Sequence, residues 1–303
     1  MDLSIIIVNY NTKDLLIHCV ESIVKHTKGL KYEIVVVDNN SDDKVKSSWF
    51  DSTEHITIIL NKENKGFGAA NNIGLERAQG AYILLLNSDT LIHDNVLSET
   101  VSWIKVNKKV GGVSCALKNS DGTMQGSGGY FPTLSKVFAW MFFLEDVPFL
   151  DQLIKPFHPT HGQSFFYTGT KQFEKKREQD WVTGAFMLIP KKVLEEVGVF
   201  DTDYFMYTEE VDLCFRIKKA GYAIWYLPAW SITHFGGASS TNEFPLLQEY
   251  KSMKLFYQKH MPVWQMPVLR LFLKLGAIIR IPLFGILKGK EVAKIYAKAF
   301  TIA

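Results

Sequence analysis

The chain has 303 residues, of which 47% are hydrophobic and 21% charged, and its formal net charge at pH 7 is +3. This composition is typical of a globular protein with a full core, built as one large α/β domain or as a domain with an appendage. The three cysteines lie far apart and form no CxxC pair, which argues against a zinc ribbon or disulfide framework and favours a reducing cytosol. Residues 3–8 form an apolar run that is preceded by one acidic residue and by no basic region. We therefore expect a strand there and not a signal peptide.

Strands and helices alternate along the first half of the chain. The predicted strands lie at residues 3–8, 34–37, 56–60 and 82–86. The predicted helices lie at residues 15–24, 69–79 and 96–106. Each strand is an apolar run that ends in polar residues. Such alternation predicts a parallel sheet with right-handed crossovers.

The second half is less regular. Residues 118–180 are rich in glycine, proline and aromatic residues, and predict long loops or a hairpin near the functional site. The ordered elements expected here are strands at 110–117, 181–189 and 223–227 and helices at 192–197 and 211–220. Beyond Gly237 the pattern becomes basic and helical. We therefore expect a catalytic domain at residues 1–240 and a helical extension at residues 241–303.

The end of the chain is strongly basic. From residue 251 onward ten Lys and Arg residues face one acid, Glu291, so this segment carries +9 and residues 1–250 carry −6. Residues 262–287 are apolar but interrupted by charges and prolines, so we do not expect a spanning helix. Basic residues among apolar ones suit a helix lying on an anionic membrane leaflet. Packing on the catalytic domain or on a second subunit is the open alternative.

Asp89 is the residue around which we organise the candidate site. The apolar run at residues 83–86 stops abruptly at Asn87, Ser88 and Asp89. In open α/β sheets, ligands bind just outside the carboxyl ends of the strands. We therefore expect Asp89 to lie where chemistry takes place, with a capped turn as the alternative.

Two further stretches indicate a nucleotide ligand. Asp38 follows a predicted strand, where its carboxylate can accept hydrogen bonds from a ring N–H or a sugar hydroxyl, although an Asx turn would also explain it. Residues 64–74 open a helix with Gly66, Gly68 and small residues, which favours an anion such as diphosphate. A Rossmann fingerprint is disfavoured, because this stretch does not follow the first strand and Asn71 stands where a third glycine is required.

An acidic cluster and a histidine complete the candidates. Glu209, Glu210 and Asp212 repel one another, an arrangement that commonly reflects the binding of a metal, proton or hydroxyl. The alternative is a solvated helix start, but the apolar residues on both sides favour the functional interpretation. Arg216 follows on the same helix. His234, after a strand and a turn at Pro228, gains weight only if it lies beside Asp89.

Together these motifs resemble the family 2 inverting glycosyltransferases of the GT-A fold, particularly the bacterial branch that includes rhamnosyltransferases of cell-surface polysaccharide assembly. The likeness covers roughly residues 3–240. In order, it runs through SIIIVNYN, VVVDNNSDD, NKGFGAANNIG, LLLNSDT, WVTGAFMLIP, FDTDYFMYTEEVDLCFR and GYAIWYLPAWSITHFGGAS. It implies an α/β nucleotide-diphospho-sugar transferase fold with a mostly parallel central sheet flanked by helices, followed here by the helical extension.

The resemblance also implies roles for single residues. The donor-binding residues would be Asn9, Tyr10, Asp38, Asn40, Asn64, Gly66, Asn71, Ser88, Asp89, Gly184 and Ala185. Asp89, which matches the last aspartate of the family's DxD motif, would hold Mn²⁺ or Mg²⁺ together with His234, and this mixed ligand set suits Mn²⁺ better. Glu210 stands where the family has the aspartate that acts as catalytic base, and Asp212 or Glu209 are alternatives for that role.

The implied function is metal-dependent, inverting sugar transfer from a nucleotide-sugar donor to a saccharide or lipid-linked saccharide in cell-surface polysaccharide assembly. dTDP-rhamnose is the first donor expected. A UDP-hexose-dependent transferase and a non-catalytic nucleotide-sugar-binding scaffold are the alternatives. We expect a cytoplasmic protein, with peripheral contact to the inner face of an anionic membrane as a further hypothesis. A nucleic-acid partner is not expected, and a homo-oligomer is left open.

Overall fold

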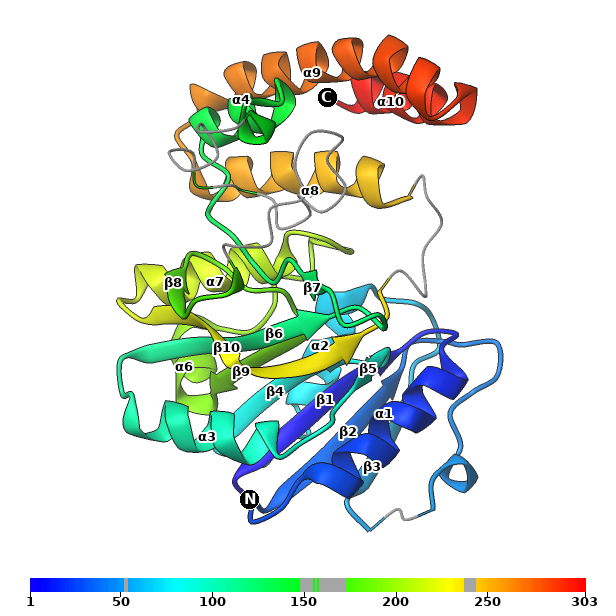
Figure 1. The fold of residues 1–303 in the computed structure, drawn as a ribbon, viewed down its shortest axis with the longest axis vertical. Coiled ribbons are helices and arrows are strands. Elements are labelled where there is room, and N and C mark those ends of the chain that lie inside the picture. The colour runs from blue at the N-terminus through cyan, green and yellow to red at the C-terminus, as the bar shows by residue number, and fades with distance from the viewer. Residues whose placement is uncertain (52–53, 148–154, 156, 158–172, 237–243) are drawn as a thin grey trace.

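A single mixed sheet forms the body of the protein. The computed structural model describes residues 1–51, 54–147, 155, 157, 173–236 and 244–303 (Figure 1). The strands among these residues are β1 (Leu3–Asn9), β2 (Tyr32–Asp38), β3 (Ile56–Leu60), β4 (Tyr82–Asn87), β5 (Thr90–Leu91), β6 (Val110–Lys118), β7 (Met124–Gln125), β8 (Arg177–Gln179), β9 (Phe186–Pro190) and β10 (Ala223–His234). Their order is β3-β2-β1-β4-β9-β6-β10-β5, with β7 paired to β6 and β8 to β10.

The first half of the sheet is parallel, as the alternation in the sequence predicts. β1 lies between β2 and β4, in a register that pairs Val8 with both Val37 and Asn87. The polar residues at the ends of these strands therefore gather at one edge of the sheet, which we call the carboxyl edge. The second half is mixed, because β9 runs antiparallel to β4 and β6 while β6 and β10 are parallel. The α/β class is confirmed, and the antiparallel insertion of β9 is the feature that the sequence did not indicate.

Helices cover both faces of the sheet, because its central strands are apolar on both sides. The helices of this body are α1 (Lys13–His26), α2 (Phe67–Leu75), α3 (Val96–Val106), α6 (Lys191–Val197) and α7 (Glu209–Lys219). Ile5 of β1 shares a buried cluster with α1 and α3, whereas Ile6 belongs to the cluster that contains α2, α6 and α7. Gly74 lets α2 approach β1 closely, since a Cβ there would lie 2.5 Å from Ile6 Cγ2.

The C-terminal helices form a layer at one end of the molecule. They are α8 (Phe244–His260), α9 (Gln265–Leu287) and α10 (Lys290–Ile302), joined by α4 (Leu134–Met141). In Figure 1, α8 lies between the sheet and the outermost helices α9 and α10. None of the helices in the described part of the chain combines the length and apolar character that crossing a bilayer requires.

α9 is fixed to α4 by a close and specific contact. A Cβ at Gly276 would lie 2.5 Å from Met141 Sδ, so the glycine allows the two helices to touch. The buried Arg280 donates hydrogen bonds from Nη1 to Met141 O (2.5 Å) and from Nη2 to Trp140 O (2.7 Å). One side of α9 therefore packs on the same chain, which is one of the two alternatives expected for this segment.

Several local features differ from the expectations. Pro228 does not end its strand, because β10 continues to His234 with an irregularity between Leu227 and Ser231 in its pairing with β6. A bulge tolerates proline, which lacks the N–H that regular pairing needs. The helix expected at 69–79 ends sooner, at Leu75.

Two other expectations are only partly covered by the structure. The hairpin expected within 118–180 is present where β6 turns back into β7, although much of that range lies outside the described residues. The domain boundary expected at residue 240 falls within 237–243, also outside the described residues, and remains a prediction.

Candidate active site

The first cluster of the candidate site lies where β4 ends. Ser88 and Asp89 come directly after the strand and both are buried. β10 runs antiparallel to β5, pairing His234 with Thr90, and the Phe235 N–H donates to Asp89 O at 2.9 Å. This pairing brings the Nε2 atom of His234 within 3.3 Å of Asp89 Oδ1. The condition set by the sequence, that the histidine should lie beside Asp89, is therefore met.

The imidazole of His234 is oriented by Gln125 from the β6–β7 hairpin. Gln125 Nε2 donates to His234 O and to Asn119 Oδ1, each at 2.6 Å, which fixes the orientation of the amide. Its Oε1 atom, which can only accept, therefore faces His234 Nδ1 at 2.8 Å. The proton must lie on Nδ1. The lone pair of Nε2 then points toward Asp89, and Asn87 Nδ2 donates to it at 3.2 Å.

The residues at this point fit a divalent cation. A carboxylate oxygen and a neutral imidazole nitrogen are ligands that Mn²⁺ accepts, and a histidine ligand usually donates its other ring N–H to a fixed acceptor, as His234 does to Gln125. Within the described residues no group of three or more His, Cys, Asp or Glu side chains gathers to hold a metal. A cation at Asp89 and His234 would need ligands beyond these two side chains.

The second cluster begins at a strained turn. Tyr207 and Thr208, directly before α7, have φ angles of 63° and 73°, a left-handed conformation that costs free energy in residues other than glycine. The turn closes where the Asp212 N–H donates to Thr208 O at 2.9 Å. Glu209 and Glu210 thus project from the first turn of α7, next to residues whose backbone conformation the surrounding structure must impose.

Glu209 is buried, like Asp212 of the same cluster. Burial, together with the neighbouring charge of Glu210, raises the pKa of Glu209 well above its usual value. Its Oε2 atom has no hydrogen-bond partner among the described residues. Glu210 is only partly buried. Two neighbouring acids whose environments separate their pKa values match an arrangement in which one acid donates a hydrogen bond and the other accepts a proton.

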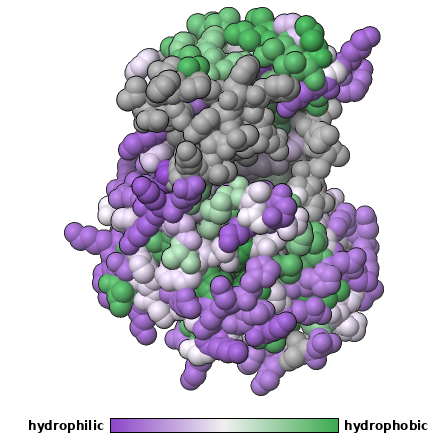
Figure 2. Space-filling view, in the orientation of Figure 1, coloured by the Kyte–Doolittle hydropathy of each residue, from purple (hydrophilic) through white to green (hydrophobic). Residues whose placement is uncertain are grey.

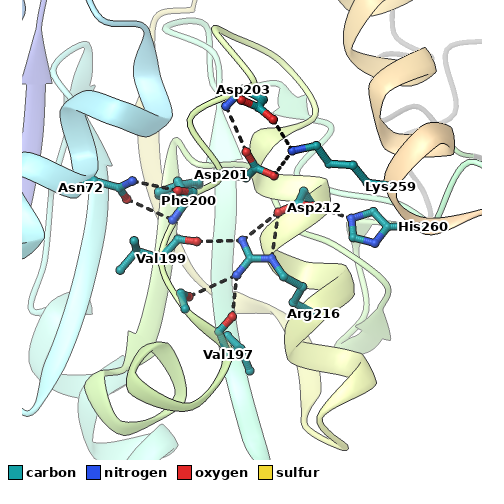
Figure 3. A network of polar contacts seen from close by, with 11 residues as sticks. Asn72, Val197, Val199, Phe200, Asp201, Asp203, Asp212, Arg216, Lys259 and His260 are labelled. Atoms are coloured by element: carbon teal, nitrogen blue, oxygen red, sulfur yellow. Dashed lines mark hydrogen bonds and ion pairs between the residues drawn. The ribbon is translucent and has the colours of Figure 1, made fainter.

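Asp212 is held by ion pairs (Figure 3). Its Oδ2 atom accepts from Nε and Nη2 of Arg216 at 2.9 and 2.7 Å, and its Oδ1 atom lies 2.5 Å from His260 Nε2. Arg216 also donates to Val197 O and Val199 O, each at 2.8 Å. Both oxygens of Asp212 are therefore occupied, which argues against Asp212 as the base and leaves Glu210, with Glu209 beside it.

The same region connects three elements. Asn72 of α2 exchanges two hydrogen bonds with the backbone of Phe200, and Lys259 of α8 forms ion pairs with Asp201 and Asp203 (Figure 3). The loop that leads into α7 is thereby tied to α2 on one side and to the C-terminal layer on the other.

The donor-binding candidates at the ends of β1 and β2 form a hydrogen-bonded chain. Thr12 Oγ1 lies 2.8 Å from both Asn9 Oδ1 and Ser88 Oγ, and Asn9 Nδ2 donates to Ser41 Oγ at 3.0 Å. Asp38 is fully buried, and its carboxylate accepts from the backbone N–H groups of Ser41 (3.1 Å) and Val45 (3.3 Å). The carboxylate thus holds the turn that follows β2, as in the alternative interpretation of Asp38 as a turn residue. Tyr10 lies partly buried beside Asn9.

The glycine stretch lies against the loop before α7. Gly66 has φ 83°, and a Cβ there would meet Phe205 O at 2.1 Å. The Phe67 N–H donates to that same carbonyl at 3.0 Å, so it is not available to an anion. Asn64 Oδ1 accepts from the Gly66 N–H (3.0 Å), and Asn71 Nδ2 bonds within its own helix, to Phe67 O. The start of α2 therefore closes on the residues that carry the acidic cluster.

The remaining donor candidates border the same area or lie at its margin. A Cβ at Gly184 would touch the Phe67 ring at 2.8 Å, and Ala185 O accepts from the Asn87 N–H at 3.2 Å. Asn40, with φ 71°, accepts a hydrogen bond from Lys44 Nζ at 2.6 Å. Ala185, Asp89 and His234 thus lie in contact at the end of β4, whereas Gly66 and Gly184 contact Phe205 and Phe67 at the start of α2.

Sequence reasoning missed two residues of these clusters. Gln125 had a usable signal, because residues 119–122 (Asn-Ser-Asp-Gly) form a typical turn sequence that places the next residues back against β6. His260 had none. It lies 48 residues after Asp212, in a helix whose packing the sequence pattern does not determine.

Comparison with known proteins identifies the family of this chain. A family model described as glycosyl transferase family 2 matches residues 4–198. The chain is 24% identical over 254 residues to an N-acetylglucosaminyl-diphospho-decaprenol L-rhamnosyltransferase of Mycobacterium tuberculosis, covering 78% of each chain. It is 27% identical over 242 residues to the rhamnosyltransferase WbbL of Escherichia coli, covering 76% of this chain and 82% of the relative.

Solved structures share the fold. GalNAc-T7 with UDP, GalNAc and Mn²⁺ superposes on 98% of this chain with a TM-score of 0.59 at 15% identity, and the match spans 54% of that longer chain. The mannosyltransferase PcManGT from Pyrobaculum calidifontis, in complex with GDP-Man and Mn²⁺, superposes on 99% of this chain with a TM-score of 0.57 at 17% identity, spanning 80% of its own length. The expected GT-A fold is confirmed.

Proposed function

Since the chain belongs to glycosyltransferase family 2, and its relatives include rhamnosyltransferases, we propose that it transfers rhamnose from dTDP-rhamnose, with inversion and with the help of a divalent cation. The observation that carries this proposal is the 3.3 Å approach of His234 Nε2 to Asp89 Oδ1 at the carboxyl edge. A UDP-hexose donor is the second candidate, because the protein groups that would contact the sugar are the same.

In the proposed mechanism the side chains of Asp89 and His234 would hold the cation, and Gln125 would orient the imidazole by accepting from its Nδ1–H. When bound, Mn²⁺ or Mg²⁺ would neutralise the charge that develops on the leaving nucleotide. Glu210 removes the proton from the acceptor hydroxyl as it attacks the anomeric carbon in line. The raised pKa of Glu209 disfavours a second negative charge beside the base.

We propose that the acceptor is a saccharide, and more specifically a saccharide linked to a lipid. The relative from M. tuberculosis is named for a decaprenol-linked substrate. We therefore place the enzyme in the cytoplasm at the inner face of the cell membrane, with residues 1–240 as the catalytic domain and residues 241–303 as the part that lies closest to the acceptor's lipid.

The experiment is a donor screen that measures nucleotide release and nucleotide binding in the same samples. The donors are dTDP-rhamnose, UDP-glucose, UDP-galactose, UDP-N-acetylglucosamine and GDP-mannose, each with Mn²⁺, Mg²⁺ or EDTA. We expect release from dTDP-rhamnose that requires the cation and is lost in Asp89→Ala. Release from a UDP-hexose alone would replace the donor, and an absence of both binding and release would contradict the proposed transferase.

A further inference from the structure

α9 has two apolar sides. With 3.6 residues per turn, neighbouring residues are rotated by about 100° around a helix. The buried residues Leu269, Leu273, Ala277 and Arg280 fall on one side, which faces α4 and α8. Six exposed apolar residues fall on the opposite side, and we call them the outer face of α9: Trp264, Leu271, Leu275, Ile278, Ile279 and Ile286. Leu287, the last residue of the helix, is also exposed but lies in line with Leu269.

This outer face is strongly exposed. Ile286 is 85% exposed, Trp264 65% and Ile278 49%. Elsewhere in the described chain the exposed large apolar side chains are scattered, which is normal for a protein surface. Figure 2 shows the hydrophobic colour gathered over the end of the molecule that Figure 1 assigns to α9 and α10. An apolar patch of this kind marks an interaction site.

The charges beside the outer face are almost all positive. Arg270 and Lys274 are exposed along one flank of it, and residues 265–287 contain no acid. Lys288 and Lys290 come at its end and are also exposed. A helix with apolar residues flanked by Lys and Arg, and with a tryptophan at its start, has the pattern of one that lies in the interface of an anionic bilayer.

The same charges argue against a second copy of the chain as the occupant. In a symmetric dimer the same patch meets itself, so Arg270 and Lys274 of both copies would be brought together across the contact. α9 offers no acid to neutralise them. An anionic lipid surface supplies that charge and accepts the apolar side chains at the same time.

We propose that the outer face of α9 docks the protein on an anionic lipid bilayer, with its apolar side chains at the level of the headgroups. Because α9 is fixed to α4 through Gly276 and Arg280, the face is presented by a packed helix and needs no rearrangement. The link to a lipid-borne acceptor rests on the proposed function, but the docking itself does not.

The test is co-sedimentation of the full chain with vesicles, in the absence of nucleotide and acceptor. Vesicles of phosphatidylcholine alone are compared with vesicles containing phosphatidylglycerol. We expect binding to the anionic vesicles that weakens with added salt. It should fall at least about tenfold in Leu275→Asp/Ile278→Asp, because each buried apolar side chain adds to interfacial binding. Arg270→Glu/Lys274→Glu should reduce it as well.

The matched control is Val106→Asp, which places an acid on a residue that is 76% exposed at the end of α3. This variant should bind vesicles as the unchanged protein does. Equal binding by Leu275→Asp/Ile278→Asp and the control would overturn the proposal. So would a dimer, seen by light scattering, that only the α9 variants dissociate, because the face would then pair with its own copy. Donor turnover in the same variants reports separately on the proposed function.

Discussion

The two clusters of the candidate site are held in place in different ways. Asp89 comes directly after β4, and its partner His234 is placed by strand pairing, with one supporting residue from a neighbouring hairpin. The acids of α7 start from a strained turn and are held through Asp212 by a loop and by α8 of the C-terminal layer. The proposed metal-binding pair therefore depends on the sheet, whereas the proposed base depends on contacts between distant parts of the chain.

The sharpest way to separate the two clusters is Glu210→Gln. The amide keeps the shape of the side chain but cannot take a proton, so transfer should fall by about 10²–10⁴-fold, the usual contribution of a general base. Donor and Mn²⁺ affinity should change little, because both belong to the other cluster. Initial rates of transfer and calorimetric donor binding measure the two effects. Transfer at the original rate would remove Glu210 from the mechanism.

In the cluster of Asp89 and His234, Gln125→Leu should lower the affinity for Mn²⁺ only through its effect on His234. Without the Oε1 acceptor the proton is no longer fixed on Nδ1, and the loss of such a partner typically weakens metal binding by about 10–100-fold. Electron paramagnetic resonance measures Mn²⁺ binding, and nitrogen NMR of His234 reports which ring nitrogen carries the proton. Gln79→Leu, an exposed residue near the opposite edge of the sheet, is the control. Unchanged Mn²⁺ affinity and an unchanged tautomer would contradict the assigned role.

For the α7 cluster, His260→Phe removes one partner of the buried Asp212. The ring lies 4.6 Å from Phe215 and 4.9 Å from Phe256, centroid to centroid, so phenylalanine can keep the packing. Leaving Asp212 Oδ1 without its partner should lower the free energy of unfolding by about 1–3 kcal/mol. Urea unfolding measures the change, and His18→Phe, exposed on α1, is the control. Equal stability of the two variants would mean that this contact does not hold α7.

The last variant of the α7 cluster is Glu209→Gln, whose effect on stability depends on pH. Since the pKa of Glu209 is raised in the folded protein, the folded state keeps a proton that the unfolded state has lost. Stability should therefore fall as the pH rises above about 4.5, the ordinary pKa, at up to about 1.4 kcal/mol per pH unit until the folded-state pKa is reached. The variant should show a flatter curve and greater stability at neutral pH. Urea unfolding between pH 5 and pH 8 checks this, with the exposed Glu195→Gln expected to follow the original slope.

Local sequence patterns were enough to predict the parallel half of the sheet. Apolar runs ending in polar residues located β1, β2, β3 and β4, and with them Asp89 at the carboxyl edge. They did not predict that β9 enters the sheet antiparallel, because a short buried strand has the same pattern in either direction. Pro228 was interpreted as a turn, since proline usually interrupts a strand, but the bulge in β10 accommodates it.

The partners of the site residues were harder to predict than the residues themselves. Gln125 and His260 contact His234 and Asp212 across 109 and 48 residues, and side-chain pairing over such distances depends on tertiary packing. The resemblance supplied the roles of Asp89, His234 and Glu210, but family motifs carry no information on which neighbours hold them. The outer face of α9 could be predicted in part. Its apolar and basic composition is visible in the sequence, but only the fold decides which side of the helix is exposed.

The measurement that tests the proposed site most directly is a Mn²⁺ titration followed by electron paramagnetic resonance, with dTDP present, on the unchanged protein and on Asp89→Ala and His234→Ala. If these two side chains hold the cation, the unchanged protein binds Mn²⁺ together with the nucleotide, and each variant loses most of that binding. Mn²⁺ bound equally well by either variant would contradict the assignment of the metal to the carboxyl edge of β4.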